Sequence, residues 1–296
     1  MILDPAHRPV ARLEPTVRVC RWNYGTSDAT SWFLVLLDAT RDHPLQEELS
    51  AHTRAAAGWL ENALGRGGGF VRCGPRRFAG GLAQQGWRDC LDPTGDPDGG
   101  GIVHLDGSMP PSPLADADSQ AVAVAALDAL TRLDPGHAEH WSTLRTALRT
   151  RLSSTFTPEM MAVDGADRPV AGAGSQLGWL LWSGALDEHT AEAAADRLAR
   201  PDVLTDFGVR TLSVDHPRFG PALYHRGAVW PFDNWIAWGA LRAMRRSADA
   251  DRIRTGVLKA VRKLGRYPEL YAVHTSGQLL AVPVANQISR RLVRCW

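Results

Sequence analysis

Apolar residues recur three and four positions apart along most of the chain, which is the spacing of one face of an α-helix. One such face comprises Leu45, Leu49, His52, Ala56, Leu60 and Leu64, and others run through residues 122–133, 141–152 and 253–264. Helices are also expected near residues 29–41, 174–186, 188–200 and 230–246. Alternation at period two is scarce, so the pattern predicts about nine helices, arranged as hairpins, without a substantial sheet.

Two long segments, residues 65–117 and 201–229, interrupt this helical pattern and are rich in Gly, Pro and Trp. Long loops in a compact domain either carry function or are disordered. The aromatic residues in or beside them include Trp87, Phe207, Phe219, Tyr224 and Trp230. Because these side chains need packing partners, functional loops are favoured over disorder.

Composition and charge limit which partners the protein can be expected to bind and in which cellular compartment it is expected. The 296 residues carry a formal charge of +1 without a long basic run, which disfavours nucleic acid and membrane surfaces as partners. No apolar N-terminal stretch has the length of a signal peptide or membrane helix, so a cytoplasmic protein is expected. Cys20, Cys73, Cys90 and Cys295 lack metal-ligand spacing, which predicts reduced thiols, no metal site and no cofactor.

The first long loop places Asp89 two residues after Trp87. A carboxyl group against an indole ring loses hydration, which raises its pKa toward the range of a general acid near neutrality. In the alternative interpretation Asp89 caps the next helix or pairs with Arg88. The residue pattern leaves both interpretations open.

The second long loop suits a polyhydroxylated ligand. Residues 207–213 and 224–235 bring Arg, Tyr, His, Trp, Asp and Asn into a short span. Aromatic faces can cover the apolar side of a sugar ring, while the polar groups bind its hydroxyls. The alternative is an irregular loop held by buried aromatic side chains.

Glu269 supplies a second isolated acid, which lies between bulky residues and far from Asp89 in the sequence. An inverting glycoside hydrolase needs one carboxylic acid to protonate the leaving oxygen and one carboxylate to activate water. The two groups stand about 6.5–9.5 Å apart so that the water fits between them. Asp89 and Glu269 are therefore candidates for this pair.

Six motifs resemble the glycogen-debranching-like, or amylo-alpha-1,6-glucosidase, family of glycoside hydrolases. They are YGTSDAT at residues 24–30, QQGWRDC at 84–90, GWLLWSG at 178–184, GVRTLS at 208–213, YHRGAVWPFDN at 224–234 and RYPEL at 266–270. The resemblance implies an all-α fold, an (α/α)6-toroid-like helical barrel, with Asp89 as general acid and Glu269 as general base. It also implies a sugar site lined by Tyr24, Asp28, Trp87, Gln120, Arg210, His225, Trp230 and Asp233.

The chain departs from this family in two respects. Family members begin with further helices and a Phe-Gly-Arg-Asp-Ser loop that nothing here matches, so the barrel is expected to be incomplete, with about nine of twelve helices. We expect an extended segment over residues 1–21, a single partial barrel domain over 22–296, and a partner chain or self-association that covers the open flanks. Trp179 and Phe232 replace histidines of the family, which makes the expected site less polar.

The sequence therefore predicts an inverting glycosidase acting on an α-glucoside or similar small glycoside. One alternative is an enzyme that uses the same acid and base for dehydration, cyclisation or isomerisation in a biosynthetic pathway, as the less polar site would allow. Another is a non-catalytic remnant that binds a sugar or a partner domain. Both enzyme hypotheses require Asp89 and Glu269 to face one shared space.

Overall fold

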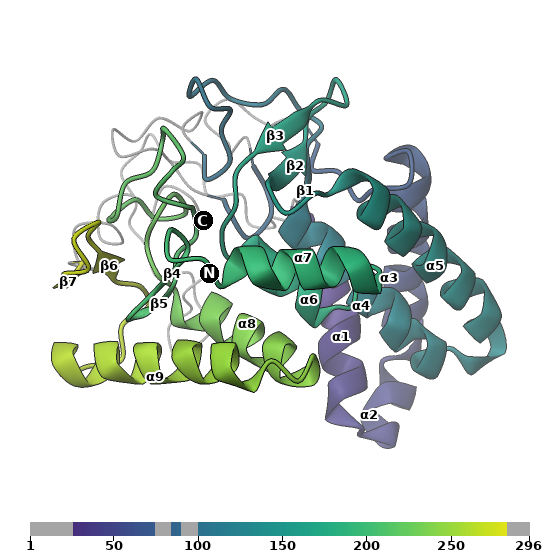
Figure 1. The fold of residues 1–296 in the computed structure, drawn as a ribbon. Helices are drawn as coiled ribbons and strands as arrows, with labels where there is room; N and C mark the ends of the chain where they lie inside the picture. The colour runs from purple at the N-terminus through teal and green to yellow at the C-terminus, as the bar shows by residue number, and fades with distance from the viewer. Residues whose placement is uncertain (1–25, 75–83, 90–99, 283–296) are drawn as a thin grey trace, which may run out of the picture.

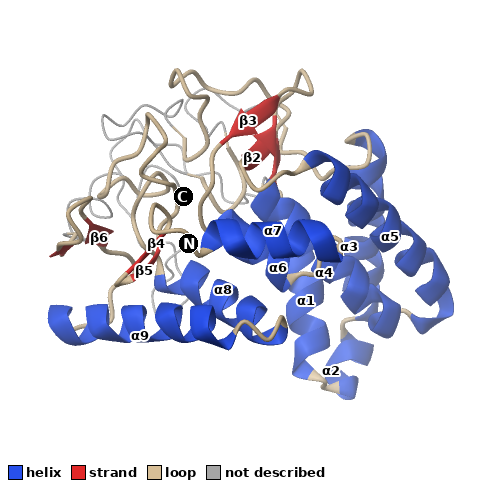
Figure 2. Ribbon diagram, in the orientation of Figure 1, coloured by secondary structure: helices blue, strands red, loops and turns tan. Residues whose placement is uncertain are grey.

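The computed structural model describes residues 26–74, 84–89 and 100–282, and the chain within these ranges is mostly helical (Figure 1, Figure 2). The helices are α1 (Ala29–Thr40), α2 (His43–Glu48), α3 (Ser50–Arg66), α4 (Ala117–Leu133), α5 (Ala138–Thr155), α6 (Gln176–Trp182), α7 (Glu188–Leu198), α8 (Pro231–Ala243) and α9 (Ser247–Leu264). A short 3-10 helix, η1 (Pro135–His137), follows α4. The predicted all-α fold is confirmed, and the described ranges contain the nine α-helices just named.

Eight of these helices form four successive hairpins. The inner layer consists of α1, α4, α6 and α8, which contact one another in this order, and the outer helices α3, α5, α7 and α9 each pack on the inner helix of their own hairpin (Figure 1). Six such hairpins would close an (α/α)6 ring. The described residues thus form an arc of four, as the prediction of an incomplete toroid requires.

Inner and outer helices differ in how much of their surface they bury. Nearly every face of α4 and α6 is buried, and the many alanines of α4 allow neighbours on both sides to approach closely. Each outer helix buries one apolar stripe, such as Ala250, Ile253 and Ala260 in α9, and keeps charges on the opposite face. Among the helices that the structure describes, none is both long and apolar enough to cross a membrane.

Local sequence signals set several helix ends. Asp42, Asp116 and Asp187 precede α2, α4 and α7, and each accepts a hydrogen bond from the backbone N–H three residues on. Helix α4 ends at Leu133, just before the predicted stop that begins at Asp134. Helix α9 is followed by Gly265, whose φ of 66° is the left-handed conformation that glycine adopts easily.

The predicted continuous helical face across residues 45–64 is wrong. The chain forms α2 and α3, with a break at Leu49, where ψ is 9°. Within α3, Leu60 and Leu64 are buried, whereas His52 in its first turn is exposed.

In the part of the chain that the structure describes, seven short strands lie between the helices or follow α9. They are β1 (Ala115–Asp116), β2 (Met160–Val163), β3 (Pro169–Ala171), β4 (Leu204–Thr205), β5 (Gly208–Val209), β6 (Ala272–Val273) and β7 (Leu279–Leu280). All pairings are antiparallel, in the sheets β1–β2–β3, β4–β5 and β6–β7. Val229 forms bridges with Arg210 and Tyr271, so the segment that contains Glu269 lies against the second long loop.

Helices α6 and α8 come into close contact at Gly178, where a Cβ atom would lie 2.6 Å from the Cβ of Ala237. Gly178→Ala should force the helices apart and lower the free energy of unfolding by about 1–3 kcal/mol. Thermal unfolding would then show a drop in Tm of several degrees. Gly239→Ala on α8, where a Cβ meets open space, is the control and should stabilise slightly. Equal effects of the two substitutions would contradict this interpretation.

Candidate active site

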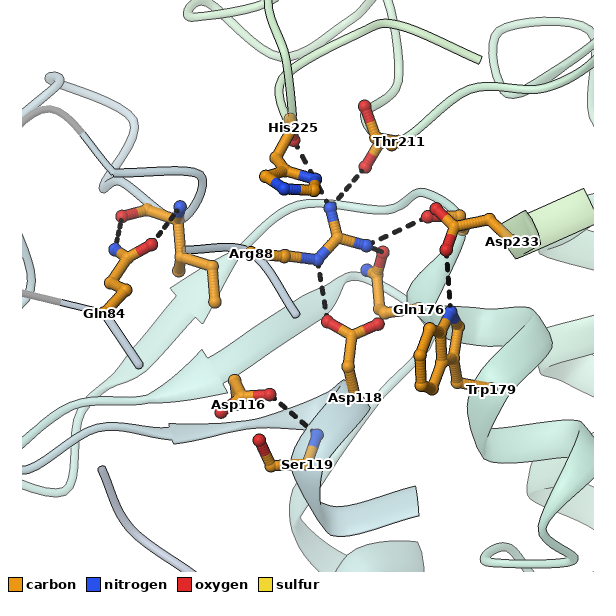
Figure 3. A network of polar contacts seen from close by, with 12 residues as sticks. Gln84, Arg88, Asp116, Asp118, Ser119, Gln176, Trp179, Thr211, His225 and Asp233 are labelled. Atoms are coloured by element: carbon orange, nitrogen blue, oxygen red, sulfur yellow. Dashed lines mark hydrogen bonds and ion pairs between the residues drawn. The ribbon is translucent and has the colours of Figure 1, made fainter. Parts of the chain in front are cut away.

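The N-terminal ends of the four inner helices meet at one place. Asp28 precedes α1, Asp118 lies in the first turn of α4, Ser175 precedes α6, and Asp233 lies in the first turn of α8. Figure 3 shows the ends of α4, α6 and α8 around the side chain of Arg88. A helix N-terminus carries a partial positive charge, so their convergence favours negative groups at this position.

Arg88 is the centre of this arrangement and is only 2% exposed. Its Nε donates to Asp118 Oδ2 at 2.7 Å. The other N–H groups donate, at 2.9–3.4 Å, to the carbonyl oxygens of Thr211 and His225, to Ser175 Oγ and to Gln176 Oε1. Since a guanidinium has five N–H groups in a fixed fork, Arg88 joins its own loop to α4, α6 and the second long loop at once.

Carboxyl groups outnumber the cation in this cluster, which we call the acid cluster and which comprises Asp28, Asp89, Asp116, Asp118 and Asp233. Burial raises the pKa of Asp28 to about 6, that of Asp116 to about 7 and that of Asp233 to about 6. The charge of Asp118 contributes to the raised pKa of all three. Within the described ranges, no group of three or more His, Cys, Asp and Glu side chains could hold a metal ion.

Asp89 lies at the end of a tight turn, in which its N–H donates to Gly86 O at 3.0 Å. Burial and, second to it, the charge of Asp28 hold the pKa of Asp89 well above its usual range. The ion pair found for Arg88 in the described ranges is with Asp118. These contacts favour the desolvated-acid interpretation of Asp89 over pairing with its neighbour.

The turn that carries Asp89 is fixed against the ends of α1 and α4. Ser27 N–H donates to Gln85 O at 2.9 Å, and the hydroxyls of Ser27 and Ser119 are 2.9 Å apart. Gly86 lies so close to α4 that a Cβ atom would be 2.8 Å from Ser119 Oγ. A glycine at this position therefore lets the turn approach the two helix ends.

Aromatic rings form a second cluster beside the acids. The His225 ring stacks on Trp230, with ring centroids 5.1 Å apart and planes 9° apart, and the Trp87 ring meets both edge-on. Trp179 and Phe232 also contact Trp87, and Trp179 Nε1 donates to Asp233 Oδ1 at 3.1 Å. Burial holds the pKa of His225 well below its usual range, so its imidazole is neutral.

Glu269 is exposed and is joined to this aromatic cluster through Tyr224. The Tyr224 hydroxyl donates to Glu269 Oε1 at 3.1 Å, and the Tyr224 ring contacts Trp230 and His225 edge-on. The loops that carry Asp89 and Glu269 therefore meet at the same set of rings. The catalytic roles of the two acids stay predictions.

The remaining predicted site residues differ in their surroundings. The amide of Gln120 is fully buried and bonds to the backbone N–H and O of Val71 and to Asp116 O. Arg210 is buried and donates from Nη2 to Val273 O and His274 O. Both side chains bond to backbone groups, as residues that support a fold do. Tyr24 lies outside the described residues.

Sequence reasoning did not assign a role in the site to Arg88, Asp116 or Asp118, and it treated Trp179 only as a departure from a family pattern. The signal for Arg88 was its place between Trp87 and Asp89. Its partner Asp118 lies 30 positions away, and no spacing rule connects them.

Residues 112–274, from just before β1 to just after β6, match the family model of the mannosylglycerate hydrolase MGH1-like glycoside hydrolase domain. The chain belongs to this family. The resemblance inferred from the motifs is thereby confirmed at the level of a glycoside hydrolase-like enzyme domain. The narrower glycogen-debranching-like assignment stays a prediction.

Similar solved structures include a GH63 mannosylglycerate hydrolase from Thermus thermophilus in complex with glucose. It is 22% identical, with a TM-score of 0.48, and the match covers 62% of this chain and 45% of that one. Neutral trehalase Nth1 from Saccharomyces cerevisiae is 12% identical, with a TM-score of 0.45 and coverage of 54% and 34%. The chain thus spans less than half the length of these structures. No curated protein matches it.

Removal of the Arg88 cation should destabilise the fold. Arg88→Met leaves Asp118 buried without its ion pair, and we expect a loss of about 3–5 kcal/mol in the free energy of unfolding, measured with urea. Arg88→Lys keeps the charge but cannot make five fixed hydrogen bonds, so the loss should be smaller. The double variant R88M/D118N should lose less than the sum of the single variants; additivity would show that the pair does not interact.

Asp116 should make stability fall as pH rises. Its pKa is about 7 in the fold against 3.8 for the free side chain, so its contribution is full below 3.8 and is lost as pH rises through about 7. Asp116→Asn keeps an acceptor for Ser119 N–H, removes the buried charge, and should raise the free energy of unfolding in mildly alkaline buffer. Denaturant titrations at several pH values test this.

Asp187→Asn is the matched control, because Asp187 is an exposed cap of α7 whose pKa is lowered by its hydrogen bond from Thr190 N–H. Its contribution is present above the usual pKa and is lost as pH falls. D187N should therefore give no gain in alkaline buffer. An equal gain in both variants would contradict the role of burial at Asp116.

Proposed function

We propose that this chain carries the acid–base centre of an inverting glycoside hydrolase that acts on an α-glucoside or similar small glycoside. Asp89 is the general acid and Glu269 the general base. The observation that supports the proposal is the environment of Asp89, whose pKa is raised well above its usual range by burial and by the charge of Asp28. Asp89 precedes residues 112–274, which match the glycoside hydrolase family, and its loop is tied to them through the ion pair of Arg88 with Asp118. A carboxyl of this kind holds its proton at the pH where a glycosidase needs an acid.

In the proposed reaction Asp89 gives its proton to the glycosidic oxygen as the bond from that oxygen to the anomeric carbon breaks. Water attacks the anomeric carbon from the opposite face and loses a proton to the Glu269 carboxylate. The products are the free alcohol and a sugar of inverted anomeric configuration. Exchange with solvent returns Glu269 to its carboxylate and Asp89 to its acid form.

The rings and acids beside Asp89 support a sugar as the ligand. Trp87 Nε1 and His225 Nδ1 are buried polar atoms without a hydrogen-bond partner among the described residues. Hydroxyl groups of a sugar can satisfy such atoms, while the indole of Trp87 covers an apolar ring face. The family name suggests mannosylglycerate as one ligand to test beside glucosides.

The ends of the helical arc support the further proposal that additional helices or a partner chain cover them. Leu36 on α1 is 60% exposed, and Trp235 on α8 is 59% exposed. α1 and α8 are the first and last inner helices, whereas α4 and α6, with neighbours on both sides, bury nearly all their residues. Large exposed apolar side chains at such edges are typical of an interface.

Asp89→Asn and Glu269→Gln should each lower kcat/KM for the hydrolysed glycoside by about 10²–10⁴-fold, because each removes one proton transfer. A panel of α-glucosides, trehalose and mannosylglycerate identifies the substrate, and NMR of the first product tests inversion at the anomeric carbon. Asp42→Asn and Glu139→Gln, both at exposed positions, are the controls and should keep full activity. Retained turnover in D89N or E269Q would exclude the assigned role.

A further inference from the structure

Exposed apolar side chains are concentrated at the two ends of the arc. The described ranges expose seven large apolar side chains, and all but Leu105 lie on the first hairpin, on the last one, or just after it. They are Leu36 and Trp59 in α1 and α3, Phe232, Trp235 and Leu258 in α8 and α9, and Tyr267 after α9. The hairpins α4–α5 and α6–α7, which have neighbours on both sides, expose none of this set. The open ends therefore have the character of contact surfaces.

The open side of each end helix lies opposite its inner neighbour. On α8, Ala237 lies against α6, and Trp235 is two positions before it. On α1, Asp38 accepts hydrogen bonds from Arg132 of α4, and Leu36 is two positions before it. Two positions in an α-helix correspond to a rotation of about 200°, so Trp235 and Leu36 point away from α6 and α4.

The composition of α1 also indicates that its open side is meant to be covered. Its twelve residues include one charged side chain, Asp38, and that side chain is bonded to α4. A helix that is apolar on nearly every side is normally buried on every side. Among the helices that the structure describes, α1 packs mainly on α3 and α4, which leaves the side of Leu36 open.

The two end hairpins carry opposite charge. Residues 231–264, which include α8 and α9, contain eight Arg and Lys against three Asp and Glu. Residues 26–66, which include α1, α2 and α3, contain three Arg against six Asp and Glu. Like ends of two copies would repel each other, whereas unlike ends attract each other. The charge therefore favours the first hairpin of a second copy as the occupant of the last hairpin's open side.

The apolar and charged positions of the two ends also follow in the same order. Because the N-terminal ends of the inner helices meet at the site, their C-terminal ends lie on the other side of the arc. Arg242 is exposed at this end of α8, and Asp42 and Glu47 are exposed just after this end of α1. Trp235 lies seven positions before Arg242. Leu36 lies six positions before Asp42, so the two faces can match apolar and charged groups at once.

We propose that a second copy of this chain docks head to tail on the first. The α1 face of one copy, Leu36 and Asp42, lies against the α8 face of the other, Trp235 and Arg242. The inference rests on the part of the proposed function in which the ends of the arc are covered, and it stands apart from the proposed hydrolysis. Two arcs of four hairpins exceed the six of one closed ring, so each pair leaves one face of each kind open, and further copies can add there.

Sedimentation of the intact chain tests the contact. The mass of the wild type should rise above that of the monomer as its concentration increases. Leu36→Lys gives the α1 face the charge of the α8 face, and Trp235→Glu gives the α8 face the charge of the α1 face, so each variant alone should stay monomeric. Leu105→Lys, at the exposed apolar position away from both ends, is the control and should associate like the wild type. A monomeric wild type, or an equal loss in L105K, overturns the inference.

A mixture of the two variants separates head-to-tail docking from a symmetric contact. L36K keeps an intact α8 face and W235E an intact α1 face, so equal amounts should form a 1:1 dimer and nothing larger. Such a dimer also shows that both variants are folded. A symmetric contact through one kind of face predicts instead that one of the variants associates by itself like the wild type, and that result overturns the inference.

Activity measurements keep this inference separate from the proposed chemistry. If a strictly monomeric wild type hydrolyses a glycoside, the catalytic proposal stands and the docking of a second copy fails. If the wild type and the mixture associate as expected but no glycoside is hydrolysed, the docking stands and the catalytic proposal fails.

Discussion

The buried guanidinium of Arg88 is the constraint on which the rest of the site depends. It ties one loop to α4, α6 and the second long loop through five N–H groups. Burial of a charge costs several kcal/mol unless the charge is paired and hydrogen-bonded, and the carboxylate of Asp118 with four neutral acceptors meets that condition. Arg88 holds the acids and rings of the site in place, because its hydrogen bonds fix the segments that carry them relative to one another.

One cation cannot neutralise five carboxyl groups, and this imbalance gives the site its chemical character. Burial raises the pKa values of Asp28, Asp116 and Asp233 into the range of about 6 to 7. The helix N-termini that meet here compensate part of the negative charge, but a dipole end is worth less than a full cation. Some of these carboxyl groups therefore keep a proton near neutral pH, and their burial lowers the stability of the fold. Such a loss of stability is common at catalytic sites.

Much of the fold could be predicted because amphipathic outer helices leave a clear period in the sequence. The end of α4 at Leu133 and the irregular loops around Asp89 and Glu269 could also be predicted, because turn residues and isolated acids are signals within a short stretch of sequence. Two other contacts could not be predicted, because they join segments that are 30 and 49 positions apart. They are the ion pair of Arg88 with Asp118 and the hydrogen bond of Val71 N–H to the Gln120 amide. A break such as that at Leu49 depends on backbone geometry that the apolar spacing does not encode.

Trp179 and Phe232, which replace histidines of the family that the motifs resemble, differ in their effect on the site. Trp179 keeps a polar function, because its indole N–H donates to Asp233, as a histidine N–H at that position could. Phe232 has no polar atom, is 39% exposed, and contacts Trp87 in the loop of Asp89. Phe232 is therefore the position at which the proposed activity would differ in substrate from other members of the family, while Trp179 keeps its hydrogen bond to Asp233 of the acid cluster.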